Sequence, residues 1–526
     1  MVVDLQFMSV LASVIVGPVV VGICLSFAME WMLTPRATVF YRRSISAISL
    51  HVGSWLLLFC LEMMLFKRPW FAMGNVLAIQ LLLVLVNNAK YHAMREPFLV
   101  HDFEYFTDAI KHPRLYLPFF GVFKTILALC VFLGVLAAGI ALEPSVLGVA
   151  SGTFWLGAWL SGLLVSVMLL WIGLRLNRLP VTLNPSVDFL AMGQVTFLWL
   201  YAVAHFKHQV STPECAWAEV VSNIAAVDSL PDIVAVQSES FFDARQDYNV
   251  IDKEVLSGFD RICSESVNTG RLSVPAWGAN TIRTESAFLT GRSADDLGIH
   301  QFSPYRHFIK HRQVTIAHQL KSLGYKTVCV HPYPASFYMR EKLYPELGFD
   351  HFVDISDFNE SQKVGQYIGD MAVANYVKSL LRGDEQPVFV FVITMENHGP
   401  LHLEKANEAD KEAFYKEHQP ENCEDLTVYL RHIRQADRMI DALRDHLAVS
   451  PRGGMLCWYG DHVPIMPKVY KQLGLPSGLT DYFIWHSATS DTTCQSPTMQ
   501  KDISELAPML LTQLVVCSAN GKSDKS

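Results

Sequence analysis

The sequence predicts two parts of different fold class: an N-terminal bundle of transmembrane helices, followed by an α/β domain with a mostly parallel sheet. Of the 526 residues, 51% are hydrophobic and only 17% are charged, which exceeds the apolar content of ordinary soluble proteins. This excess lies in roughly the first third of the chain, where long apolar runs recur. Further on, short β-rich runs alternate with helical patterns, as in a parallel sheet covered by helices.

The first part, residues 1–178, contains five apolar stretches that are long enough to cross a bilayer, which takes about 20 mostly apolar residues. They are 7–31, 46–66, 70–88, 120–142 and 146–174. The first stretch is too long for a removable signal peptide and lacks a clear small-residue cleavage site, so we expect it to remain as an anchor.

A further apolar segment, 187–206, lies in a linker that we place at 179–227. Because it contains Asp188, Gln194 and His205, we interpret it as an interfacial helix, with a sixth span as the alternative. Five spans place the following domain outside the cytoplasm if the N-terminus is inside, against the positive-inside rule. Six spans place it outside in agreement with that rule.

The domain that we place at 228–517 shows strand patterns, helical patterns and a final tail. Strands are predicted at 232–237, 326–330, 388–394 and 454–459, and helices at 281–290, 314–323, 363–382 and 423–447. Residues 518–526 are expected to be disordered. In such a fold the site should lie beyond the carboxyl ends of the parallel strands.

Each predicted strand is followed by a carboxylate or an imidazole. These residues are Glu239, His331, His398, Asp461 and His462. One such residue alone is more often a turn residue or a helix cap, but four strand ends gathered at one edge indicate a site. Two carboxylates with an imidazole suit a divalent metal, and the oxygen ligands favour harder ions such as Mn²⁺ or Mg²⁺ over Zn²⁺.

The segment "GANTIRTESAF" offers hydroxyl groups, Thr281 and Thr284, at the start of a predicted helix. A hydroxyl close to a metal loses its proton more readily and becomes a nucleophile. The backbone N–H groups at a helix start also favour an arriving phosphoryl group. The local sequence leaves a second interpretation open, in which Thr281 is a helix N-cap.

Several function classes lack support. The net charge of −8 argues against a nucleic-acid partner, because such proteins usually present a basic face. The C-terminal part contains no Walker A loop, no G-x-S-x-G elbow and no G-x-G-x-x-G motif, which removes the corresponding nucleotide-binding and hydrolase classes.

Taken together, "SES", "GANTIRTESAF", "HPYPASFYMREKLYPELGFDHFVD", "NHGP" and "YGDH" resemble the lipoteichoic acid synthase group of phosphoglycerol transferases. That group is membrane-anchored and belongs to the alkaline phosphatase and sulfatase superfamily. The resemblance implies one divalent metal ion, Mn²⁺ before Mg²⁺ or Zn²⁺, held by Glu239, Thr281, Asp461 and His462. It also implies that Thr281 is the nucleophile.

The resemblance further implies a substrate pocket. Substrate-binding roles fall on His331, Tyr338, Arg340 and Glu285, with Glu285 as a supporting group on the same side of the helix as Thr281. His398 would hold or protonate the phosphoryl or leaving group. Tyr338 stands where lipoteichoic acid synthases carry tryptophan, which leaves the exact headgroup open.

The implied activity is transfer of phosphoglycerol from phosphatidylglycerol to an extracytoplasmic glycan or glycolipid, through a covalent phospho-threonine. The enzyme would be a multi-pass protein of the bacterial inner membrane, with the phospholipid bilayer and the acceptor as partners. One alternative is a phosphoethanolamine transferase acting on lipid A or glycan, and another is a catalytically silent scaffold or sensor. Sulfate ester hydrolysis is not expected, because Thr281-Ile282-Arg283 lacks the Cys/Ser-x-Pro-x-Arg pattern of sulfatases.

Overall fold

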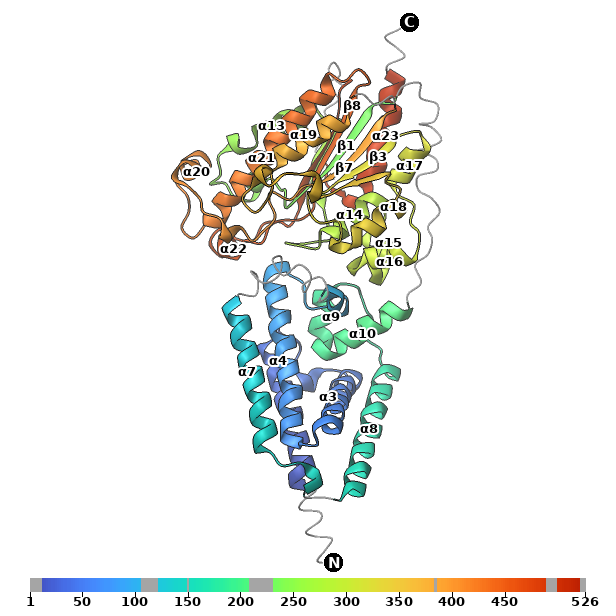
Figure 1. Ribbon diagram of the computed structural model, residues 1–526, viewed down its shortest axis with the longest axis vertical. Coiled ribbons are helices and arrows are strands. Elements are labelled where there is room, and N and C mark those ends of the chain that lie inside the picture. Colours follow the sequence, from blue (N-terminus) through green and yellow to red (C-terminus); the bar gives the residue numbers. More distant parts are fainter. Residues whose placement is uncertain are drawn as a thin grey trace, which may run out of the picture. The chain divides into compact units, whose positions relative to one another are not determined.

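The computed structural model describes residues 12–105, 122–148, 151–207, 230–382, 386–488 and 499–520. The chain divides into two compact units, Met1–His208 and Gln209–Ser526. Both are shown in Figure 1, the first as a set of helices and the second as a sheet with helices on both faces. The predicted combination of apolar N-terminal helices and a C-terminal α/β domain is confirmed.

Among the described residues of the N-terminal unit, four apolar stretches of helix are long enough to cross a membrane: Val14–Met32, Ile45–Phe66, Pro69–Met94 and Gly152–Arg175. The first comprises a π-helical turn, α2 (Gly17–Met29) and a 3-10 turn, and the others are α3, α4 and α8. The predicted span 120–142 corresponds to α7 (Val122–Leu142). The apolar stretch at this position, Phe132–Gly148, begins within α7, extends past its end and is shorter than a membrane span.

Three buried ionisable side chains in this unit lie together, as the low polarity of a bilayer favours. The carboxylate of Glu30 lies 2.5 Å from Nη1 of Arg43 and 3.6 Å from Nδ1 of His51, and all three side chains are less than 5% exposed. Close helix contact has a visible cause at Gly22, where an added Cβ would lie 2.2 Å from the Trp55 ring. These contacts make the helices a packed bundle.

The segment 187–206 forms a broken helix. Its two parts are α9 (Pro185–Met192) and α10 (Gln194–Lys207), separated by Gly193 with φ +75°. A Cβ at Gly193 would lie 2.1 Å from Nη1 of Arg43, so glycine suits both the backbone and the space. Each part is shorter than the roughly 20 residues of a span, and the interfacial interpretation of this segment stays a prediction.

The C-terminal unit is built on an eight-stranded sheet with strand order β10-β2-β9-β8-β1-β7-β3-β4. The five strands from β8 to β4 run parallel, and β9 runs antiparallel to both of its neighbours. The bounds are β1 Asp232–Ser238, β2 Asn268–Ser273, β3 Lys326–Val330, β4 His351–Val353, β7 Val388–Ile393, β8 Gly454–Gly460, β9 Thr480–His486 and β10 Lys501–Asp502. The mostly parallel sheet is confirmed, and all four predicted strands are present.

Helices cover both faces of this sheet (Figure 1). One face packs against α13 (Ser257–Glu265), α19 (Asp370–Leu380) and α21 (Glu424–Ala448), and its core contains Val234 and Val236 of β1. On the other face, Phe288 of α14 (Thr281–Thr290) stacks on Phe391 of β7 with ring centroids 5.6 Å apart. The core therefore fixes α14 against the centre of the sheet.

Two helix predictions need correction. The pattern at 363–382 begins as a hairpin, β5 (Lys363–Val364) and β6 (Tyr367–Ile368), and only then becomes α19. Gly365 has φ +66°, a conformation typical of a turn. The pattern at 314–323 is the shorter α17 (Ile316–Ser322), and α23 (Ile503–Asn520) extends into the predicted tail, whose last residues, 521–526, lie outside the described ranges.

Candidate active site

The ends of the central parallel strands place the predicted site residues at one edge of the sheet. Gln237 of β1 pairs in register with Tyr459 of β8 and with Ile393 of β7. Residues a few positions further on, Glu239 and Asp461 among them, therefore leave the sheet at the same level. The topology explains why residues more than 200 positions apart in the sequence lie together.

Three of these residues form a buried cluster. Glu239, Asp461 and His462 each offer a ligand atom, and these atoms lie within 4.8 Å of one another. Nε2 of His462 is 3.4 Å from Oδ2 of Asp461 and 3.7 Å from Oε1 of Glu239. Within the part of the chain that the structure describes, Oδ2 of Asp461 and Nε2 of His462 are buried without a hydrogen-bond partner.

Such unsatisfied buried atoms are costly unless something binds them. Burial, and then the neighbouring Asp461 carboxylate, raise the pKa of Glu239 to about 8. A divalent cation would satisfy the open atoms and balance the two carboxylates, and carboxylate and imidazole are suitable donors for Mn²⁺, Mg²⁺ or Zn²⁺. The three residues therefore fit a metal ion.

The loops that carry the cluster are held together by backbone contacts. The N–H of Ser240 donates to Oδ1 of Asp461 at 2.8 Å, and its hydroxyl donates to Oε1 of Glu239 at 2.9 Å. At Gly460 an added Cβ would lie 1.7 Å from the carbonyl oxygen of Phe241, so the position before Asp461 accepts only glycine. Sequence reasoning missed Ser240, although it is the last residue of the "SES" motif.

Thr281 is the first residue of α14 and is partly exposed. The residue before it, Asn280, is the N-cap and has φ +66°, so the N-cap interpretation of Thr281 is wrong. Thr284, one turn further on, is fully buried and donates to the backbone carbonyl of Asp461 at 2.8 Å. Thr284 thus connects the first turn of α14 to the loop that carries two residues of the cluster.

A second buried group surrounds Arg340, at the start of α18 (Arg340–Glu346). Its guanidinium donates to both oxygens of Glu285, at 2.7 and 3.3 Å, and lies 3.2 Å from Nε2 of His331. Arg340 and Glu285 are 1% and 0% exposed. The hydroxyl of Tyr344 also donates to Glu285. Both Glu285 oxygens are therefore occupied by protein groups.

The contacts of His331 define its protonation. An arginine nitrogen only donates, so Nε2 of His331 accepts from Arg340, and Nδ1 donates to the carbonyl of Ile393 at 3.2 Å. Burial, with the nearby guanidinium of Arg340, holds the pKa of His331 well below its usual range. His331 is therefore a neutral imidazole that orients the arginine.

Tyr338 and His398 are half-buried residues next to these groups. Tyr338 has a left-handed backbone, φ +54°, and the guanidinium carbon of Arg340 lies 5.3 Å from the centre of its ring. Asn397, which precedes His398, donates to the carbonyl of Glu239 at 3.1 Å. This contact fixes the "NHGP" segment beside the buried cluster.

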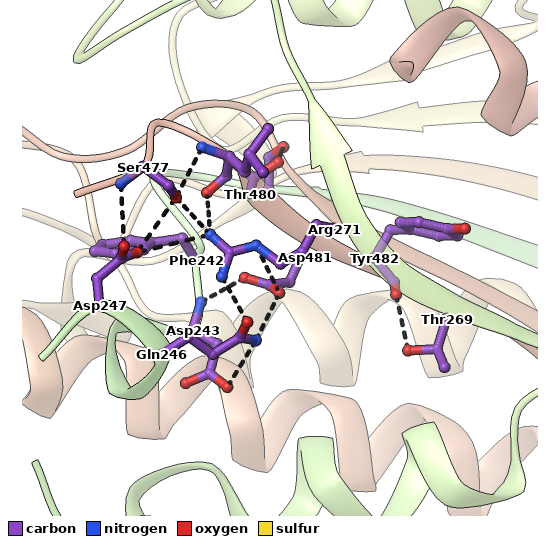
Figure 2. A network of polar contacts seen from close by, with 12 residues as sticks. Phe242, Asp243, Gln246, Asp247, Thr269, Arg271, Ser477, Thr480, Asp481 and Tyr482 are labelled. Carbon is purple, nitrogen blue, oxygen red and sulfur yellow. Dashed lines mark hydrogen bonds and ion pairs between the residues drawn. The ribbon is translucent and has the colours of Figure 1, made fainter. Parts of the chain in front are cut away.

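A polar network supports the segment that follows Glu239 (Figure 2). Arg271 of β2 donates to Gln246 at 2.7 Å and to Ser477 at 2.8 Å, and Asp481 of β9 accepts from the backbone N–H of Asp243 at 2.7 Å. Burial raises the pKa of Asp481 to about 7. The network joins α12 (Ala244–Asp247) to β2 and β9, and sequence reasoning missed it.

A model of the sulfatase family matches residues 231–514, more than half of the chain. The chain belongs to the sulfatase family. The expected membership of the alkaline phosphatase and sulfatase superfamily is therefore confirmed, and the matched range contains every predicted site residue.

Individual relatives share about a quarter of their residues with this chain. The chain is 27% identical over 456 residues to the capsular polysaccharide biosynthesis protein RkpI of Rhizobium meliloti, and the alignment covers 83% of this chain and 80% of RkpI. It is 26% identical over 168 residues to lipoteichoic acid synthase 1 of Bacillus subtilis, covering 30% of this chain and 25% of that one. The phosphoglycerol transferase GacH of Streptococcus pyogenes, solved with sn-glycerol-1-phosphate, is 23% identical with TM-score 0.46 and coverage of 59% and 85%.

Proposed function

We propose that this protein is a metal-dependent transferase that moves phosphoglycerol from phosphatidylglycerol to an extracytoplasmic glycan or glycolipid. The observation that carries the proposal is the unsatisfied buried cluster of Glu239, Asp461 and His462, which Thr284 connects to the helix turn that begins with Thr281. A nucleophilic hydroxyl at a helix start beside a cation suits phosphoryl transfer.

The proposed reaction has two steps with Thr281 as the covalent carrier. In the first, Thr281 loses its proton to solvent and bonds to phosphorus, while the bond from phosphorus to the diacylglycerol oxygen breaks. That oxygen takes a proton from Nε2 of His398, which enters the step as an imidazolium and leaves it as a neutral imidazole. In the second, the acceptor hydroxyl gives its proton to His398 and bonds to phosphorus, and Thr281 leaves and regains a proton from solvent.

Glu239, Asp461 and His462, with the Thr281 oxygen as a fourth ligand, would hold the divalent metal ion. The ion would supply positive charge that lowers the pKa of the Thr281 hydroxyl and offsets charge on the phosphoryl group. We favour Mn²⁺, with Mg²⁺ and Zn²⁺ as the other ions that such a ligand set accepts.

Arg340 is proposed to bind the phosphate of the donor, because a guanidinium grips phosphate oxygens in a forked geometry. Glu285 and His331 fix the orientation of that fork. Since Glu285 is 0% exposed, we assign it an effect on substrate through Arg340. Tyr338, beside Arg340, is proposed to contact the headgroup.

Donor, acceptor and location have separate support. The four long apolar helices support a multi-pass protein of the bacterial inner membrane, with the C-terminal unit outside the cytoplasm. Similarity to a capsular polysaccharide biosynthesis protein supports a glycan acceptor. The short match to a lipoteichoic acid synthase supports phosphoglycerol as the transferred group.

A lipid-release assay tests the donor. Purified full-length protein with Mn²⁺ is incubated with phosphatidylglycerol or with phosphatidylethanolamine, and diacylglycerol is measured. We expect release from phosphatidylglycerol and loss of that release in Thr281→Ala. Release from phosphatidylethanolamine alone would identify that lipid as the donor and leave the proposed mechanism unchanged. Full activity of Thr281→Ala would contradict the assignment of the nucleophile.

A further inference from the structure

The hairpin β5–β6 carries a tyrosine that contacts His398. The hydroxyl of Tyr367 lies 3.3 Å from Nδ1 of His398 and 3.4 Å from the carbonyl oxygen of Gly399. The rings of Tyr367 and His398 are 5.3 Å apart between centroids and inclined by 64°. Tyr367 therefore contacts the imidazole ring and one of its nitrogens.

The carbonyl of Gly399 defines which nitrogen of His398 carries hydrogen. Nδ1 lies 2.7 Å from this oxygen, and a carbonyl only accepts, so Nδ1 must be the donor. Across the described ranges, the imidazole of His398 makes its hydrogen bonds through Nδ1. Nε2 is thus the nitrogen left to exchange a proton with a substrate oxygen.

The hairpin is itself fixed to the segment that carries His398. Directly after β6, the N–H of Asp370 donates to Glu396 at 2.7 Å, and both side chains are 1% exposed. Gly369 allows this close approach, because a Cβ there would lie 2.7 Å from Val364 and 3.4 Å from Glu396. The segment that carries Glu396 and His398 therefore holds the hairpin, and with it Tyr367, in place.

We infer that Tyr367 is a positioning residue, which holds the His398 imidazole so that Nε2 meets the oxygen of the leaving diacylglycerol. The inference deepens the proposed function and rests on it. Tyr367 takes no proton from substrate and forms no bond to it. Its hydroxyl shares the Gly399 carbonyl with Nδ1, and its ring limits rotation of the imidazole.

The test compares Tyr367→Phe with wild-type full-length protein on two donors. One is the phospholipid that the wild-type protein cleaves. The other is a nitrophenyl ester of phosphoglycerol, whose leaving group departs without a proton. Tyr376→Phe is the matched control, because Tyr376 is a half-exposed tyrosine on α19 whose ring packs on Phe358.

For Tyr367→Phe we expect kcat on the phospholipid to fall about tenfold, the effect of losing roughly one hydrogen bond, with KM changed less than about twofold. On the nitrophenyl ester we expect the rate of the first turnover, measured as nitrophenol released before any acceptor step, to stay within about twofold. Tyr376→Phe should match wild type on both donors.

Two results would overturn the role of Tyr367: equal kcat for Tyr367→Phe and wild type on the phospholipid, or an equal loss on both donors, which indicates a general structural effect. Both require an active wild-type protein. A wild-type protein inactive on every phospholipid would instead contradict the proposed function, so the two failures are distinguishable.

Discussion

At the scale of single residues, the site combines buried charges that are balanced with buried charges that are not. Arg340 and Glu285 balance each other in an ion pair almost without exposure. Asp461 and His462 point buried atoms at each other that have no hydrogen-bond partner among the described residues. The first arrangement fixes the orientation of the guanidinium, and the second leaves buried atoms that the proposed metal ion would satisfy.

Removing the charge of Glu285 should therefore lower the stability of the folded protein. We expect Glu285→Gln to leave the Arg340 guanidinium buried without its counter-charge, which costs about 3–5 kcal/mol of unfolding free energy. Thermal unfolding of the C-terminal unit within the full-length protein measures the change.

The control for this prediction is Glu408→Gln. Glu408 forms an ion pair with Lys411 at 2.7 Å, but its side chain is 83% exposed, and such pairs contribute about 0–1 kcal/mol. Equal destabilisation by the two substitutions would contradict the view that Glu285 and Arg340 form a desolvated pair.

Removing one carboxylate of the buried cluster should act on metal content. In Asp461→Asn we expect bound Mn²⁺ to fall at least tenfold when the purified protein is assayed by elemental analysis after dialysis against limiting metal. Asp437→Asn is the comparison, since Asp437 is a buried carboxylate that caps α13 through Gly258 and Phe259. Wild-type metal content in Asp461→Asn would contradict the assigned site.

At the scale of elements, the network of Arg271, Asp243 and Asp481 joins α12 to two strands that sequence reasoning did not find (Figure 2). β2 contains Gly270 and mostly polar residues, so it shows no strand pattern. β9 is fully buried, but its antiparallel place between β8 and β2 depends on tertiary pairing. The mostly apolar runs of β1, β7 and β8 were predictable because strands that are buried on both faces have few polar positions.

The hairpin at 363–368 was not predicted, because the apolar spacing over 363–382 is that of one helix. Its two-residue strands are too short to give a pattern of their own. Tyr367 was missed with the hairpin. Residues that directly follow long strands, such as Glu239 and Asp461, were found because parallel topology gathers strand ends. Their supporting groups, Ser240 and Thr284, depend on three-dimensional contacts.

The network gives a pH prediction. Burial raises the pKa of Asp481 to about 7, above the ordinary value of about 3.9, so folding favours the protonated carboxyl. The stability that this provides is complete below about pH 4 and is lost as pH rises through 7. We expect Asp481→Asn, which stays neutral, to gain stability relative to wild type between pH 4 and 8, by an amount on the order of 1–4 kcal/mol.

Chemical unfolding of the two proteins at pH 4, 6 and 8 measures this difference. Asp247→Asn is the control, because Asp247 borders the same arginine at 3.6 Å with an 18% exposed side chain. A constant difference between Asp481→Asn and wild type across this range would contradict a protonated Asp481 at low pH.

At the scale of the whole molecule, one unit supplies helices suited to a membrane and the other supplies a sulfatase-family domain. A phospholipid donor gives a reason for joining the two in one chain, because the lipid substrate is confined to the bilayer in which the helices anchor the enzyme. The proposed function thus depends on one chemical event, the transfer of the headgroup to Thr281.

Mass spectrometry of the intact and digested protein measures that claim directly. Full-length protein loaded with Mn²⁺ is incubated with labelled phosphatidylglycerol without acceptor and then quenched in acid. We expect a phosphoglycerol adduct on the peptide that contains Thr281, and no adduct in Thr281→Ala. Labelled diacylglycerol released with Thr281 unmodified, or an adduct on a different residue, would contradict the proposed covalent intermediate.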